Sequence, residues 1–260
     1  MEFEREFLIS SSFSEETTGY KCPFCGKGFL VLFQNKFLLQ EYQSTKRKLD
    51  FLDLDPLEIK STCSGILQCN CGYCNEFVSF CGEARGDQIE FENNDVPGGS
   101  EIANVERIKI RYIHPSPRLI EIREQYPGSI KRLLKDSFSL YWSNPSSCAN
   151  KIRIIVEEVL NNLSIPKKHK KTKKKKFILS TLHHRLGRLK EKKKYEEAAE
   201  YLFAIKWIAN PASHADIFNE ESVINGYKLL DKALDLIYVG SDRQLKKLRD
   251  EINKNKKHNN

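Results

Sequence analysis

Residues 22–26 read Cys-Pro-Phe-Cys-Gly, and residues 69–75 read Cys-Asn-Cys-Gly-Tyr-Cys-Asn. Two cysteines that are two residues apart can bind one metal ion while backbone amides of the tight turn point at the sulfurs. Gly26 and Asn75 both suit the left-handed conformation that such a turn tends to need. Each stretch therefore predicts a metal knuckle, and the two together predict a zinc ribbon.

The predicted ligands of this ribbon are the four cysteines of the two pairs, Cys22, Cys25, Cys71 and Cys74. Four thiolates leave no open coordination position, so the zinc ion is predicted to be structural and not catalytic. Cys69 and Cys63 stay open as alternative ligands. Cys69 forms a competing pair with Cys71, and the segment between the knuckles is longer than a usual ribbon loop.

The composition is that of a folded chain. Of the 260 residues, 40% are hydrophobic and 30% are charged, which excludes disordered and fibrous classes. The longest apolar stretches are far shorter than the roughly 20 residues that a membrane crossing needs, so no membrane association is predicted. The first residues lack the basic and apolar regions of a secretory signal, which predicts a cytoplasmic protein.

The periodicity of apolar residues changes in the middle of the chain. Short runs rich in Val, Ile, Phe and Tyr continue to about Pro115, and Arg107–Ile113 alternates strictly, which indicates an antiparallel sheet. A period of 3.6 follows and predicts helices. We therefore expect an α+β fold with three parts: a zinc ribbon and small β domain (1–118), a helical bundle (119–240), and a C-terminal helix with a polar tail (241–260).

Two helices carry a clear apolar stripe. One stripe contains Ile152, Ile155, Val156, Val159, Leu160 and Leu163, and the other contains Val223, Tyr227, Leu230, Leu234 and Ile237. Such stripes are typical of helices that pack against a core. Further helices are predicted at residues 127–141, 178–190 and 195–209.

One lysine run accounts for the net charge of +8. It consists of Lys167, Lys168, Lys170, Lys171, Lys173, Lys174, Lys175 and Lys176. Without it the chain is neutral, so the run is the feature that predicts attraction to RNA or DNA phosphates. It is predicted to be a loop between two helices. Because aromatic residues do not interrupt the run, binding without sequence specificity is expected.

Five motifs in order resemble a bacterial family. They are the two cysteine knuckles, Tyr126-Pro127, Lys151–Glu157, and Ile205-Lys-Trp-Ile-Ala-Asn-Pro-Ala-Ser-His214. Together they are similar to a domain of unknown function with an N-terminal zinc ribbon and a divergent HEPN-like helical domain. This family is found with type I restriction subunits and phage-defence genes.

The resemblance implies a helical bundle that pairs as a homodimer, and it implies candidate site residues. It maps His214 onto the catalytic histidine of HEPN ribonucleases and Asn210 onto the polar residue beside their arginine. That arginine is missing here, and Lys206 is the nearest cation. Arg153 and Glu157 would support the site. From the residues alone, Asn210 and His214 could equally cap a helix junction. Arg153 and Glu157 could simply form an ion pair one helical turn apart.

The predicted function is binding or sensing of a nucleic acid or nucleotide, in a bacterial phage-defence context. One alternative is a metal-independent HEPN-type endoribonuclease that acts as a dimer through His214, Asn210 and Lys206. The missing arginine favours binding over catalysis. The other alternative is a structural adaptor whose ribbon binds a partner defence protein.

Overall fold

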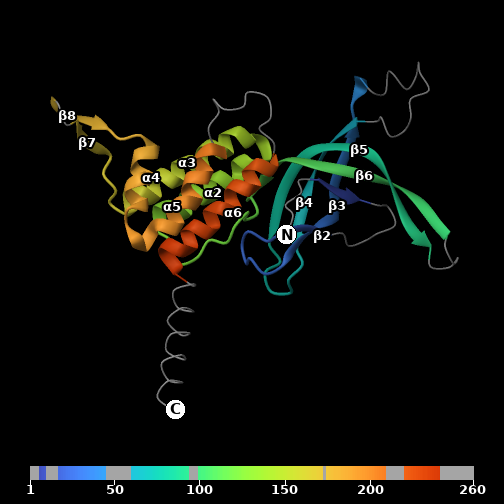
Figure 1. Cartoon of the computed structure of the whole chain (residues 1–260). Coiled ribbons are helices and arrows are strands. Elements are labelled where there is room, and N and C mark those ends of the chain that lie inside the picture. Colours follow the sequence, from blue (N-terminus) through green and yellow to red (C-terminus); the bar gives the residue numbers. More distant parts are fainter. Residues whose placement is uncertain are drawn as a thin grey trace, which may run out of the picture. The chain divides into compact units, whose positions relative to one another are not determined.

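The computed structural model describes residues 6–9, 17–44, 60–93, 99–171, 174–208 and 220–240. The chain divides into two compact units, Met1–Arg118 and Leu119–Asn260. The first contains a sheet and the second contains mainly helices, so the predicted α+β class is confirmed (Figure 1). The helix and tail predicted for residues 241–260 lie outside the described residues.

The strands of the first unit form one antiparallel sheet. They are β1 (Glu6–Ile9), β2 (Thr17–Lys21), β3 (Phe29–Glu41), β4 (Lys60–Cys69), β5 (Phe77–Asn93) and β6 (Gly99–His114). Their order across the sheet is β1-β6-β5-β4-β3-β2. Figure 1 shows β5 and β6 as long, curved strands. From β2 to β6, strands that follow one another in the chain are neighbours in the sheet, whereas β1 and β2 lie at opposite edges.

This sheet is larger than the small ribbon sheet that the sequence predicted. β5 has 17 residues and β6 has 16, whereas the apolar runs predicted short pieces. The longer strands include polar residues, because one face of an antiparallel sheet can remain in water. In β4, for example, Ser61 and Cys63 are buried while Lys60 and Thr62 are exposed. Large buried residues of this unit are Leu30, Leu67, Val78, Phe80, Ile108 and Ile110.

The α-helices described in the second unit are α2 (Gly128–Ser143), α3 (Pro145–Asn162), α4 (Leu182–Lys190), α5 (Glu196–Ile208) and α6 (Glu220–Leu234). A π-helical turn (Asp235–Val239) follows α6. Both predicted stripes face the core, where Ile155, Val159, Val223 and Leu230 are completely buried, while Leu163 at the end of the first stripe is only half-buried. Within the described residues no helix has the length and apolar character to cross a bilayer.

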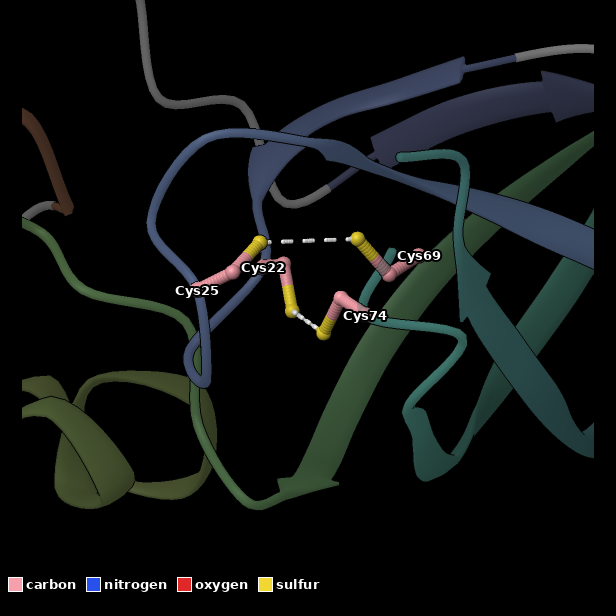
Figure 2. Close-up of side chains that lie close together, drawn as sticks. All are labelled: Cys22, Cys25, Cys69 and Cys74. Atoms are coloured by element: carbon pink, nitrogen blue, oxygen red, sulfur yellow. Dashed lines mark hydrogen bonds between the residues drawn. The ribbon is translucent and has the colours of Figure 1, made fainter. Parts of the chain in front are cut away.

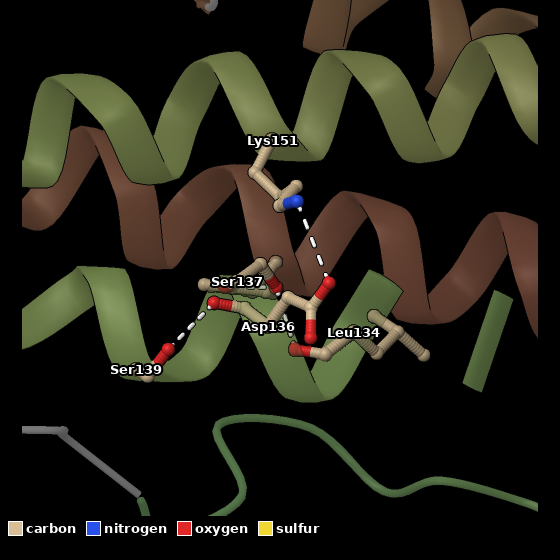
Figure 3. Close-up of polar contacts among 6 residues, drawn as sticks. Leu134, Asp136, Ser137, Ser139 and Lys151 are labelled. Carbon is tan, nitrogen blue, oxygen red and sulfur yellow. Dashed lines mark hydrogen bonds and ion pairs between the residues drawn. The ribbon is translucent and has the colours of Figure 1, made fainter. Parts of the chain in front are cut away.

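The junction between α2 and α3 is defined by a cap and by polar contacts. The side chain of Asn144 accepts a 2.9 Å hydrogen bond from the backbone N–H of Ser147, and Pro145 occupies the first helical position. Figure 3 shows Lys151 of α3 directed toward Asp136 of α2, with 3.5 Å between Nζ and Oδ2. These contacts fix the start of α3 next to α2.

The lysine run is not the predicted loop, and the predicted helix 178–190 begins later. The run forms a two-stranded antiparallel hairpin of β7 (Lys168–Lys171) and β8 (Lys174–Leu179). Lys170 lies opposite Phe177, and Lys171 lies opposite Lys174. Phe177, Ile178 and Leu179 favour the extended strand, and the hydroxyl of Thr181 then caps α4 by accepting from the N–H of His184.

Candidate metal centre

The first knuckle is a tight turn between β2 and β3. The N–H of Gly26 donates to the carbonyl of Cys22 at 2.9 Å, and Gly26 has a φ of 67°. The N–H of Cys22 donates to the carbonyl of Gly28 at 2.8 Å and closes the turn. The N–H groups of Lys27 and Gly28 both lie 3.5 Å from Cys25 Sγ. The turn therefore directs backbone donors at a sulfur, as a metal thiolate requires.

The second knuckle connects β4 to β5. The N–H of Cys74 lies 3.3 Å from Cys71 Sγ, and Asn75 has a φ of 46°. Asn70 ties this knuckle to the first one, because its side-chain oxygen accepts a 2.8 Å hydrogen bond from the N–H of Phe29. Its own N–H donates to the carbonyl of Phe29 at 2.9 Å. The ladder between β3 and β4 thus holds the two turns side by side.

Four sulfurs converge between the knuckles. The Sγ atoms of Cys22, Cys25, Cys69 and Cys74 all lie within 4.8 Å of one another. Figure 2 shows the four side chains directed toward a common centre, with 3.7 Å between Cys22 and Cys74 and 3.7 Å between Cys25 and Cys69. Tetrahedral zinc with Zn–S bonds of about 2.3 Å requires sulfur separations of about 3.8 Å. The described geometry is therefore compatible with a zinc site of four cysteine ligands.

This group contains Cys69 in place of Cys71. The sequence analysis predicted Cys71 as a ligand and kept Cys69 as an alternative. Cys71 is nevertheless close, with its Sγ 3.7 Å from that of Cys25. Cys69 is 2% exposed, whereas Cys71 is partly exposed. The sheet explains the proximity of Cys69, since it ends β4 directly opposite Leu30 of β3. Sequence spacing cannot reveal this, because it depends on the register between distant strands.

Gly28 is a residue that the sequence analysis missed. A Cβ atom at this position would lie 2.6 Å from Cys69 Sγ, 2.8 Å from Cys71 Cβ and 2.9 Å from the backbone nitrogen of Cys71. Real Cβ atoms essentially never make such short contacts. Glycine is therefore required here for the two knuckles to approach each other. The sequence feature that could have indicated this role is the second glycine in the stretch Gly26-Lys-Gly28.

The thiols of the centre differ in their tendency to ionise. Hydrogen bonds from the backbone N–H groups of Gly28 and Lys27 lower the pKa of Cys25 to about 6. Burial instead raises the pKa of Cys69 above that of an ordinary thiol. A bound cation would compensate for this burial by stabilising the thiolate. The residues therefore fit a metal ion that is bound by thiolates, two of them buried and two partly exposed.

The remaining cysteines lie away from this group. Cys63 is buried in β4, and burial raises its pKa to about 12. Cys81 is exposed on β5. Cys148 is completely buried in α3, where its Sγ lies 3.2 Å from the hydroxyl of Tyr227 and 3.2 Å from the carbonyl of Ser137. These three thiols are in environments that do not resemble a metal site.

The predicted helical site is described only in part. His214 and Asn210 lie outside the described residues. Lys206 lies on α5, with Nζ 3.4 Å from Nδ1 of His183 on α4. Arg153 and Glu157 are partly exposed on α3, with 3.7 Å between Nε and Oε1. Of the lysine run, Lys173 lies outside the described residues and the other seven lie in or next to the hairpin.

Two families of uncharacterised domains resemble parts of this chain. Residues 11–102, which include both knuckles, match the family described as Domain of unknown function (DUF8608). Residues 135–255, which include α3 to α6, match Domain of unknown function (DUF4145). Comparison with curated proteins finds no match, and comparison with solved structures finds none either. The two matched segments fall in different compact units.

Proposed function

We propose that this chain is a nucleic-acid-binding protein in which a structural zinc ion stabilises the sheet unit and the lysine hairpin β7–β8 attracts phosphates. The observation that supports binding is the gathering of the lysine run into a single hairpin. Strand pairing brings Lys171 opposite Lys174, and further lysines extend along both strands. A hairpin with this many lysines concentrates positive charge in a short segment, which favours an anionic ligand.

The zinc ion would be held by Cys22, Cys25, Cys69 and Cys74, the four cysteines whose sulfurs converge. When bound, it would supply positive charge that keeps four thiolates together and links β2, β3, β4 and β5. Four protein ligands saturate a tetrahedral ion, which supports a structural role. Chelation is expected to loosen the sheet unit, because metal-binding energy is folding energy in small metal domains.

The hairpin can be tested by titrating the protein into a fluorescently labelled RNA oligonucleotide. The variant carries Lys174→Gln, Lys175→Gln and Lys176→Gln. The control carries Lys192→Gln, Lys193→Gln and Lys194→Gln, which remove the same charge from exposed positions after α4. Up to three lost phosphate contacts should lower the slope of log affinity against log salt by about 2. Wild-type protein that binds neither RNA nor DNA at low salt would contradict the proposal.

The dimeric ribonuclease and the defence context rest on the resemblance to HEPN-like domains and stay predictions. The proposed ribonuclease centres on His214 and Asn210, about which the described residues provide no contacts. Binding is preferred because Lys206, the cation nearest to His214 in the sequence, lacks the forked guanidinium that holds phosphate oxygens in a fixed geometry.

A further inference from the structure

The sheet unit contains a second concentration of positive charge, far in sequence from the lysine hairpin. A hollow with a volume of about 270 Å3 lies over β4, β5 and β6. Five cationic side chains line it: Lys60, Arg85, Arg107, Lys109 and Arg111. We name this feature the sheet hollow.

These cations are gathered from a segment that is acidic as a whole. Residues 60–114 contain five lysines and arginines and eight aspartates and glutamates. All five cations line the sheet hollow, while Glu83 is the one carboxylate among its described lining residues. The net charge of the segment therefore hides a local positive surface, which strand pairing creates.

The register places like charges directly opposite one another. Lys60 of β4 is paired with Arg85 of β5, and Arg85 is paired with Arg107 of β6. Directly opposed like charges destabilise a sheet by a few tenths of a kcal/mol to about 1 kcal/mol for each pair. Three neighbouring strands thus carry a row of cations in which like charges lie opposite one another. Local conflicts of this kind are expected at functional sites.

A bulge in β6 completes the cluster. Gly82 is paired with Ile110 and Cys81 with Tyr112, so Arg111 is the extra residue between them. A Cβ atom on Gly82 would clash with the carbonyl oxygen of Lys109. Glycine therefore permits the close approach of β5 and β6 at this point. Bulges often redirect side chains next to binding sites.

Carboxylates balance part of this charge. Asp87 forms an ion pair with Arg107, and Glu83 forms one with Arg111 at 3.0 Å. Hydrogen bonds from these arginines hold the pKa of Asp87 and of Glu83 below their ordinary values, so both are ionised at neutral pH. Among the described residues, the five cations that line the hollow outnumber Glu83 in the lining and Asp87 beside it.

An aromatic ring lies at one side of this charge. Tyr42 lines the sheet hollow and is 39% exposed. Its N–H donates a 3.0 Å hydrogen bond to the carbonyl of Lys60, which fixes it beside the row of cations. Aromatic rings next to cationic grooves are platforms on which bases of single-stranded nucleic acids stack.

We propose that the sheet hollow binds single-stranded nucleic acid, with the five cations at the phosphates and Tyr42 against a base. This inference rests on the proposed nucleic-acid binding and assigns it a second surface. The volume of about 270 Å3 is at the small end for ligand pockets, which suits one unit of a longer strand better than an enclosed small molecule. The exposed tyrosine favours a nucleic acid over an acidic protein.

The test compares the full chain with a variant that carries Lys60→Gln, Arg85→Gln and Lys109→Gln, and keeps Arg107 and Arg111. The probe is a fluorescent oligouridylate of about 16 nucleotides, the upper end of known single-strand sites. The control carries Lys192→Gln, Lys193→Gln and Lys194→Gln, which remove the same amount of positive charge. The sheet variant should bind at least about tenfold more weakly and show a flatter salt dependence, and the control should not.

Tyr42→Ala separates base stacking from charge. It should weaken oligouridylate binding about fivefold or more, while Tyr42→Phe keeps the ring and should retain binding. Inorganic polyphosphate should bind Tyr42→Ala as well as wild type. Circular dichroism and zinc content of each variant show whether the sheet unit is intact.

The outcomes separate this inference from the proposed function. If the sheet variant is folded and binds like wild type while the hairpin variant does not, the inference is overturned and nucleic-acid binding stands. If wild type fails to bind any oligonucleotide at low salt, both are overturned. Binding of polyglutamate in preference to oligouridylate would also overturn the inference, because it would identify an acidic protein as the ligand.

Discussion

The Sγ atom of Cys25 lies 3.7 Å from the Sγ atom of Cys69, although the two residues are 44 positions apart in the chain. This distance is close to the sulfur separation of about 3.8 Å in a tetrahedral zinc thiolate centre. The relationship depends on the pairing of β3 with β4, which ends with Leu30 opposite Cys69. The metal centre and the sheet are therefore expected to depend on each other.

We predict one zinc ion per chain and a larger effect from Cys69→Ser than from Cys71→Ser. Loss of Cys69 removes a buried sulfur from the converging group, whereas Cys71 lies at its partly exposed margin. Elemental analysis after dialysis against a mild chelator measures zinc retention. Cys81→Ser is the control on the same sheet. Equal zinc retention in the Cys69→Ser and wild-type proteins, with loss in Cys71→Ser, would assign the ligand to Cys71.

Gly28→Ala should destabilise the sheet unit and weaken metal retention. The added methyl group would meet Cys69 Sγ at 2.6 Å and the backbone of Cys71 at 2.9 Å, so the knuckles must separate. Overpacking of this kind typically costs about 1–3 kcal/mol. Gly72→Ala is the matched control, because a Cβ atom there meets nothing within 4 Å. Thermal unfolding of both variants tests this, and equal stability would contradict the close approach.

The thiols should react with iodoacetamide in a defined order. At pH 8 the exposed Cys81 should be alkylated in the native protein, while the buried Cys63 should not. Because burial raises the pKa of Cys63 to about 12, roughly one molecule in ten thousand carries its thiolate at this pH. Raising the pH toward 12 should increase its reactivity. Peptide mass spectrometry locates the label, and rapid alkylation of native Cys63 at pH 8 would refute the buried position.

Asn144→Ala should lower the free energy of unfolding of the helical unit by about 1 kcal/mol. Its side chain accepts a hydrogen bond from the N–H of Ser147 and so satisfies a donor at the start of α3. Ser146→Ala is the control, since Ser146 is exposed in the first turn of the helix. Urea denaturation compares the two variants. A larger loss for Ser146→Ala would contradict the cap at Asn144.

The sequence by itself determined the structural elements that depend on interactions between residues close together in the chain. The cysteine pairs define two tight turns, because the spacing of two residues and the following Gly26 or Asn75 are local properties. The stripe from Ile152 to Leu160 defines the buried face of α3, because helical periodicity by itself decides which residues share a face. The cap of α3 follows from where the helix begins: Pro145 occupies the first helical position, so Asn144 is the N-cap.

Tertiary structure decided the relationships that depend on register between distant strands. Cys69 joins the sulfur group because β4 pairs with β3, and Gly28 matters because the two knuckles approach each other. Lys60, Arg85 and Arg107 become neighbours because three strands align, although 25 and 22 positions separate them in sequence. Charge counting along the chain cannot find such a cluster, because it averages the cations with the more numerous acidic residues of the same segment.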